Sequence, residues 1–129
     1  MSDKFKFEKL PGEPIVVFTA FESYRMAQDA QLSVEATFEF FDALDEPTNY
    51  ILNWLDLNPL DIEDVSVGAM AVALAENPIF KHPKMRKIIF VTTSEIFILA
   101  ARGLDSDTYG HIKIDVFPTL DEALQYARQ

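Results

Sequence analysis

The stretch Tyr50–Gly68, YILNWLDLNPLDIEDVSVG, decides the fold of this chain. Its first part, Tyr50–Leu57, is apolar at successive positions, which predicts a strand buried on both faces. A turn rich in acidic residues follows, and Val65–Glu76 then carries small and apolar residues that predict a helix. A strand, a turn and a helix in this order are the unit of an α/β domain, and we expect the rest of the chain to divide into similar units.

Upstream of this stretch the sequence predicts a hairpin and a helix. Phe5–Leu10 alternates apolar and charged residues like a half-exposed strand, and Ile15–Phe21 opens with a continuous apolar run typical of a buried strand. The turn between them is short, so we expect the two strands to pair antiparallel. A helix is then predicted from Asp29 or Ser33 to Leu44. Its apolar face is expected to hold residues three or four positions apart: Val34, Phe38, Phe41 and Leu44.

Downstream of the same stretch, the sequence predicts another strand and helix. A basic connection at Lys81–Lys87 leads into the run IIFVTT at Ile88–Thr93, which is typical of a buried strand. Ser94, or the threonine before it, can cap a helix that extends to Ala101 or the residue after it. Gly103 is the expected stop of that helix.

The last part of the chain predicts an edge strand and a capped helix. Ile112–Phe117 alternates apolar and polar residues, as an edge strand does, and such an edge can pair two copies of the chain into a homodimer. Thr119 and Glu122 form a capping box, in which each side chain satisfies an amide at the start of the last helix. The inner face of that helix is expected to hold Ala123, Leu124 and Ala127.

The predicted element order is therefore β-β-α-β-α-β-α-β-α, over one domain of 129 residues. Alternating strands and helices give right-handed crossovers and a largely parallel sheet. No apolar run approaches the ~20 residues that cross a bilayer, and the N-terminus shows no apolar segment of signal-peptide type. We therefore expect a cytoplasmic protein without a membrane span. Since the chain has no cysteine, it can form neither a disulfide nor a thiolate metal site.

The formal net charge is −10, and its distribution along the chain is uneven. No Lys or Arg occurs between Met26 and Phe80, whereas basic residues gather near the N-terminus and in Lys81–Lys87. An acidic surface repels phosphate backbones, so we expect no nucleic-acid partner. The acidic residues of the stretch form either a solvated face or a docking face for a basic partner. They are Asp29, Glu35, Glu39, Asp42, Asp45, Glu46, Asp56, Asp61, Glu63, Asp64 and Glu76.

The element order resembles that of STAS domains, the fold of anti-sigma-factor antagonists and of the cytoplasmic tails of sulfate transporters. It is most similar to small bacterial STAS/SEC14-like proteins, in which a basic linker with a histidine precedes a "(K/R)IIFV" strand and "VF…(D/E)EALQYA" lies near the C-terminus. The resemblance implies a mixed, mostly parallel sheet packed with helices, and a regulatory or protein-binding role. The matching residues are Lys81–His82, Arg86–Val91, Val116–Phe117 and Asp121–Ala127.

The same resemblance implies a phosphorylation site within Tyr50–Gly68. In antagonist STAS domains this turn has an Asp-Ser-Ser-Gly-like sequence, and a partner kinase, which is also the anti-sigma factor, phosphorylates its second serine. Asp64 and Ser66 match the motif's aspartate and that serine, although Val67 stands in place of the glycine. A helix start stabilises a phosphate, whereas the neighbouring acids repel it, and the alternative is an ordinary serine in a first helical turn. The candidate residues for phosphorylation or partner contact are Ser66, Asp64, Asp61 and Asp56.

Three other kinds of site have partial support in the sequence. Asp56 and the acids after it can offer oxygen ligands to Mg²⁺ or Ca²⁺, but they lack EF-hand spacing, and capping explains Asp61 and Asp64. His82 and His111 have no serine or aspartate at a recognisable catalytic spacing. The eleven phenylalanines either pack as a core or line a cavity for an apolar, lipid-like ligand.

Together these patterns predict a non-enzymatic regulatory or interaction module with a protein partner. We expect no catalytic residue, no metal and no cofactor. The alternative is a carrier or sensor of an apolar small molecule in a SEC14-like cavity.

Overall fold

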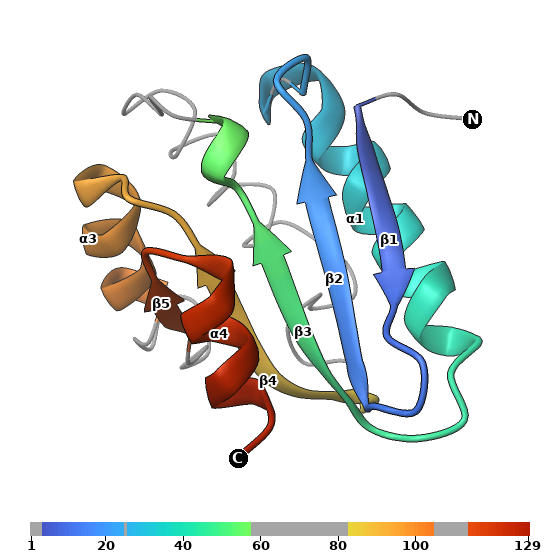
Figure 1. Ribbon diagram of the computed structural model, residues 1–129. Helices are drawn as coiled ribbons and strands as arrows, with labels where there is room; N and C mark the ends of the chain where they lie inside the picture. The colour runs from blue at the N-terminus through green and yellow to red at the C-terminus, as the bar shows by residue number, and fades with distance from the viewer. Residues whose placement is uncertain (1–3, 25, 58–82, 105–113) are drawn as a thin grey trace.

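The computed structural model describes residues 4–24, 26–57, 83–104 and 114–129. Within these residues the chain forms one five-stranded sheet in the order β1-β2-β3-β4-β5 (Figure 1). The first pair of strands is antiparallel, as predicted, and the other pairs are parallel. The protein therefore has an α/β fold with a mixed, mostly parallel sheet. The strands are β1 (Phe5–Lys9), β2 (Ile15–Ala20), β3 (Thr48–Asn53), β4 (Met85–Val91) and β5 (Asp115–Phe117).

The described helices lie on both sides of this sheet. Each connection between parallel strands moves one position in the same direction along the sheet, and right-handed crossovers then place their helices on the same face. Accordingly, α1 and α3 contribute to one core cluster, whereas α4 packs on the opposite face (Figure 1). The helices are α1 (Met26–Asp42), α3 (Glu95–Leu104) and α4 (Leu120–Ala127), and a 3₁₀ turn, η1 (Leu55–Leu57), follows β3.

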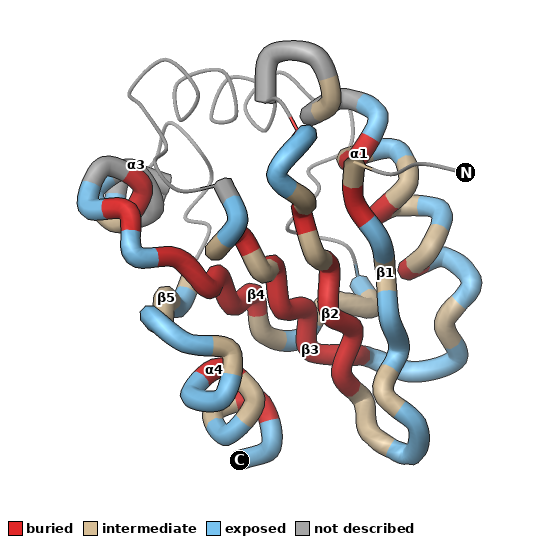
Figure 2. The backbone as a smooth tube through the Cα atoms, turned by 45° about the horizontal axis from the view of Figure 1, so that its top comes forward, coloured by how far each residue is buried: buried red, intermediate tan, exposed pale blue. Residues whose placement is uncertain are grey.

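The two faces of the sheet have cores of different composition. Because side chains alternate along a strand, each central strand contributes to both cores, and β2, β3 and the second half of β4 are buried almost throughout (Figure 2). We call the side under α1 and α3 the aromatic face; its buried residues include Phe5, Phe18, Tyr50, Trp54 and Phe90. We call the side under α4 the aliphatic face; its buried strand residues include Ile15, Val17, Ile51, Ile89 and Val91.

Ring contacts hold α1 on the aromatic face. Phe7 of β1 stacks on Phe40 of α1 with their centroids 5.0 Å apart. Phe41, which is fully buried, meets the ring of Tyr50 edge-on at 4.9 Å. Aromatic pairs in such geometries contribute about 0.5–1.5 kcal/mol each beyond the area they bury. These pairs join α1 to both β1 and β3, so the helix is fixed across several strands.

Of β1 to β4, two strands differ from their predicted bounds by more than one residue. β3 begins at Thr48 and ends at Asn53 rather than spanning Tyr50–Leu57. It ends there because the Leu55 N–H donates a hydrogen bond to Asn53 Oδ1 (3.3 Å), which turns the chain into η1. β4 begins at Met85, so part of the predicted basic connection belongs to the strand. Its first residues are exposed or half-buried, and the apolar run that predicted the strand does not include them.

The helix bounds also differ from prediction. α1 begins at Met26, in a segment to which the sequence assigned no structure. α3 continues through Gly103 to Leu104, so the prediction that this glycine stops the helix is wrong. The predicted helix Val65–Glu76 lies outside the described residues, as does most of the predicted edge strand before β5.

The predicted cap at Ser94 and the Thr119 half of the predicted capping box are confirmed by their hydrogen bonds. At the start of α3, Ser94 Oγ accepts a hydrogen bond from the Phe97 N–H (3.2 Å). At the start of α4, Thr119 Oγ1 accepts one from the Glu122 N–H (3.2 Å). Each bond satisfies an amide that the helix itself leaves unpaired, so these short motifs set where the helices begin.

Candidate functional site

The structure describes one of the four residues predicted for phosphorylation or partner contact. Asp56 lies in η1, directly after β3, and is exposed to solvent. Ser66, Asp64 and Asp61 lie outside the described residues, and the phosphorylation site therefore stays a prediction. The carboxyl ends of the parallel strands, where Asp56 lies, form the edge at which open α/β sheets commonly bind ligands.

The outward face of α1 carries a line of carboxylates, which we call the acidic stripe. It consists of Glu35, Glu39 and Asp42, which are all exposed and are spaced four and three residues apart. Leu32 stands one turn before them and is 54% exposed. Because residues at such spacings lie on one side of a helix, the four side chains share one surface. Asp42 also lies at the negative end of the helix dipole, where a carboxylate is unfavourable.

The inward face of α1 is more polar than the sequence predicts. Phe41 is buried as expected, but Val34 and Phe38 are only half-buried. Ser33 and Thr37 occupy the centre of the inward face in their place. The apolar pattern therefore predicted the helix, but it did not include these hydroxyl residues in the buried face.

Two tyrosines of the core satisfy the hydroxyls of α1. The Tyr24 hydroxyl lies 2.8 Å from Ser33 Oγ, and the Tyr50 hydroxyl lies 3.1 Å from Thr37 Oγ1. Burial raises the pKa of Tyr24 to about 12, and burial likewise raises the pKa of Tyr50. Both phenols therefore stay protonated near neutral pH and act as hydrogen-bonding groups, which gives no sign of acid–base chemistry.

Another part of the aromatic face contains the only tryptophan of the chain. Trp54 packs edge-on against Phe90 and Phe97, with ring centroids 4.7 and 5.0 Å away. Only 9% of Trp54 is exposed, and its indole N–H has no acceptor in the part of the chain that the structure describes. A buried donor without an acceptor costs roughly 1–3 kcal/mol, so this group requires an explanation.

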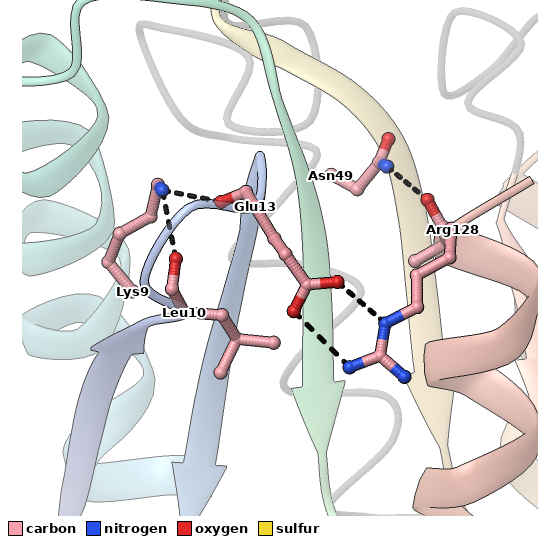
Figure 3. A network of polar contacts seen from close by, with 6 residues as sticks. Lys9, Leu10, Glu13, Asn49 and Arg128 are labelled. Atoms are coloured by element: carbon pink, nitrogen blue, oxygen red, sulfur yellow. Dashed lines mark hydrogen bonds and ion pairs between the residues drawn. The ribbon is translucent and has the colours of Figure 1, made fainter.

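A third group of polar contacts joins the end of α4 to the sheet, and we call it the C-terminal clasp. The Arg128 guanidinium donates from Nε and one terminal nitrogen to the two carboxylate oxygens of Glu13, at 2.7 and 3.2 Å (Figure 3). These hydrogen bonds lower the pKa of Glu13. Beside this pair, the buried Asn49 donates from Nδ2 to the Ala127 carbonyl at 2.8 Å (Figure 3). The clasp thus reaches both the β1–β2 turn and β3.

Tyr126 extends the clasp to two more strands. Its carbonyl accepts a hydrogen bond from Lys87 Nζ of β4 (3.3 Å), and the same Nζ lies 4.4 Å from the centre of the Tyr126 ring. Its hydroxyl donates to Asp115 Oδ2 of β5 (2.9 Å), which raises the pKa of Tyr126. Residues 126–128 therefore contact the β1–β2 turn, β3, β4 and β5.

Other kinds of site are not seen in the described residues. Across 4–24, 26–57, 83–104 and 114–129, no three His, Asp or Glu side chains come together in a way that could hold a metal ion. His82 and His111 lie outside these ranges. None of the described helices is long and apolar enough to cross a membrane.

Comparison with known proteins identified no relative of this chain. No family model, no curated protein and no solved structure matches the chain. The α/β fold and the contacts above are therefore what carry the functional argument. Of these, the sequence indicated the acidity of α1, whereas nothing in it signalled the unpaired Trp54 donor or the C-terminal clasp.

Proposed function

We propose that this protein is a non-enzymatic interaction module of STAS-like type, and that it binds a basic partner through the outward face of α1. The observation that carries the proposal is the acidic stripe, Glu35, Glu39 and Asp42, beside the exposed Leu32. The mixed sheet that begins with an antiparallel pair is consistent with the STAS-like resemblance. Fold alone does not define function, so the proposal depends on this surface.

The chemistry of the surface favours a basic protein over other partners. No Lys or Arg occurs between Met26 and Phe80, so no basic side chain of α1 itself can neutralise the stripe. Aligned carboxylates attract cationic segments and speed their association, whereas they repel phosphates. Leu32 adds an exposed apolar side chain next to the charges, which an apolar residue of the partner would remove from water. A basic helix with an apolar residue in the matching position fits this surface.

A charge reversal on α1 tests the proposal. We expect Glu35→Lys with Glu39→Lys to weaken partner binding at least tenfold, because two attractions become repulsions. The matched control, Glu8→Lys with Glu122→Lys, changes the net charge equally but alters exposed residues on β1 and α4. Immobilised protein is exposed to cell extract, retained proteins are identified by mass spectrometry, and each is then titrated in purified form. Equal retention by both variants, with circular dichroism unchanged, would contradict the proposal.

Ser66, the predicted phosphorylation site, can be tested in the same binding assay. If Ser66 is a phosphorylation site that controls this module, Ser66→Asp should change the affinity for the partner identified above. Ser66→Ala should leave the affinity unchanged, because it adds no charge. Identical affinities for Ser66→Asp and the unmodified protein would remove the phosphorylation switch while leaving the α1 surface in place.

A second candidate function, the binding of an apolar small molecule, is favoured by Trp54. Its indole N–H is buried without an acceptor among the described residues, and Phe90 and Phe97 surround it with apolar surface. An apolar molecule with an oxygen atom would satisfy the donor and pack against the rings. The neighbouring Asp56 and the net charge of −10 favour an uncharged acceptor such as a carbonyl or hydroxyl.

The single tryptophan makes this candidate straightforward to test. Trp54 gives one indole N–H signal in a nitrogen–proton NMR spectrum. We expect this signal to move downfield when an uncharged lipid such as a monoacylglycerol is added, and native mass spectrometry to show the bound mass. A signal that already has the shift and slow exchange of a hydrogen-bonded indole before any addition, and then does not move, would rule out this function.

A further inference from the structure

The cover of the aliphatic face is thin. Among the described elements, α4 is the helix that lies on this face, and it has eight residues. Its two fully buried side chains, Ala123 and Ala127, are alanines, which remove little apolar area from water, and Leu120, Leu124 and Tyr126 pack on the face only partly buried. An isolated helix of this length is not stable in water, so α4 depends on its contacts with the sheet.

The polar contacts that fix α4 are concentrated at one end. The clasp uses Tyr126, Ala127 and Arg128, the last turn of the helix and the residue after it. The other end is held by the direct connection to β5 through Pro118 and Thr119. An element with covalent attachment at one end and a polar clasp at the other can separate from the sheet without disturbing the strands beneath it.

The buried part of the clasp is only half satisfied. Asn49 is 2% exposed and donates to the Ala127 carbonyl, but its Oδ1 has no partner among the described residues. In an open state water would reach both atoms of this amide, which lowers the free energy of opening. By contrast, β2, β3 and the second half of β4 are paired on both edges and buried on both faces, so they belong to the most stable part of the fold.

We infer that α4 is a strap that opens as a unit from the aliphatic face, and that the Glu13–Arg128 pair is its latch. Opening uncovers apolar residues of the central strands, namely Ile51, Ile89 and Val91, while β1–β4 stay folded. The device lies on the face opposite α1 and operates whether or not α1 binds a partner. The proposed function and this inference can therefore fail independently.

Hydrogen exchange of the full-length protein, followed by mass spectrometry, tests the strap. We expect amides of residues 121–127 to exchange by local opening, faster than amides of β3 and β4. Arg128→Gln removes the charged pair at the exposed end of the clasp and should speed α4 exchange about two- to fivefold, the range for a well-formed surface ion pair. β3 and β4 should exchange at unchanged rates.

Two further variants make the result specific. Glu8→Gln removes another exposed ion pair, Lys6–Glu8 (3.5 Å), away from α4, and should leave α4 exchange unchanged. Glu13→Arg combined with Arg128→Glu restores the pair with reversed charges and should return α4 toward the original rate. Equal exchange of α4 and β3 in the unmodified protein would overturn the inference. So would an Arg128→Gln effect that is absent, or that accelerates α4 and the strands alike.

Discussion

At the scale of single residues, a relay of hydroxyl groups crosses the aromatic face. Thr37 Oγ1 donates to the Ser33 carbonyl one turn earlier in α1, at 2.7 Å. Its single hydrogen is then in use, so the Tyr50 hydroxyl must donate to Thr37 Oγ1 across the 3.1 Å between them. The direction of this relay, from Tyr50 to Thr37 to the backbone, follows from counting hydrogens. It makes Thr37 the acceptor on which the buried Tyr50 hydroxyl depends.

The relay predicts unequal effects of two conservative substitutions. Thr37→Val leaves the buried Tyr50 hydroxyl without an acceptor, which should lower the free energy of unfolding by about 1–3 kcal/mol. Tyr50→Phe removes a donor while Thr37 keeps its bond to the backbone, so its cost should be about 0.5–1.5 kcal/mol. The double variant should cost less than the sum of the two, because no donor is then left unpaired. Urea unfolding of the four proteins measures this cycle, and strictly additive effects would show that the two hydroxyls do not interact.

At the scale of elements, the sequence predicted best what depends on neighbouring residues. Runs of apolar residues identified the buried strands, and the motif at Thr119 and Glu122 identified the start of α4. These signals are local, since burial on both faces and amide capping need only a few consecutive residues. The predicted burial was wrong where a residue distant in the sequence satisfied a polar side chain and so allowed it to be buried. Ser33 and Thr37 face inward because tyrosines from outside α1 satisfy them, and a periodicity argument does not include such partners.

Among the candidate functional features, too, those that depend on nearby residues could be predicted from the sequence, and those that depend on distant residues could not. The acidic stripe could be predicted as an acidic face, because it depends on the absence of Lys and Arg from one helix. The latch could not, because Glu13 and Arg128 are 115 residues apart in the chain. Only the order of the strands brings them together: α4 packs across β3, β4 and β5 and ends beside the β1–β2 turn (Figures 1 and 3). Trp54 could be predicted as buried, but whether its N–H finds an acceptor is a property of the folded core.

At the scale of the whole molecule, the two faces of the sheet differ in the helix they carry, in their packing and in the role that we infer for them. The aromatic face carries α1, whose outer surface is acidic, and is held by ring contacts and buried hydroxyls. The aliphatic face carries α4, which is held by two buried alanines, partly buried apolar side chains and a polar clasp. Buried hydroxyl groups join α1 to the aromatic face, whereas the aliphatic face is joined to α4 by the buried Asn49 and by an exposed ion pair at the end of the helix. This arrangement places partner binding and the inferred opening on opposite sides of one rigid sheet.

The buried phenols set a limit on the stability of the whole fold at high pH. Burial raises the pKa of Tyr24 from 10.0 to about 12, and the pKa of Tyr50 is raised by its complete burial. Below pH 10 both are protonated in the folded and unfolded chains, so their contribution to stability is constant. Between pH 10 and 12 the unfolded chain loses these protons and the folded chain keeps them, so the free energy of unfolding falls by about 1.4 kcal/mol per pH unit for each tyrosine.

We therefore expect the protein to unfold cooperatively within this alkaline range. The difference in tyrosinate absorbance between the unmodified protein and Tyr24→Phe should show Tyr24 ionising only as the circular dichroism of the sheet is lost. Tyr24→Phe should make stability less dependent on pH, because one of the two coupled protons is gone. Ionisation of Tyr24 near pH 10 with the sheet intact would mean that water reaches its hydroxyl, and that the aromatic face is not the closed core on which α1 is held.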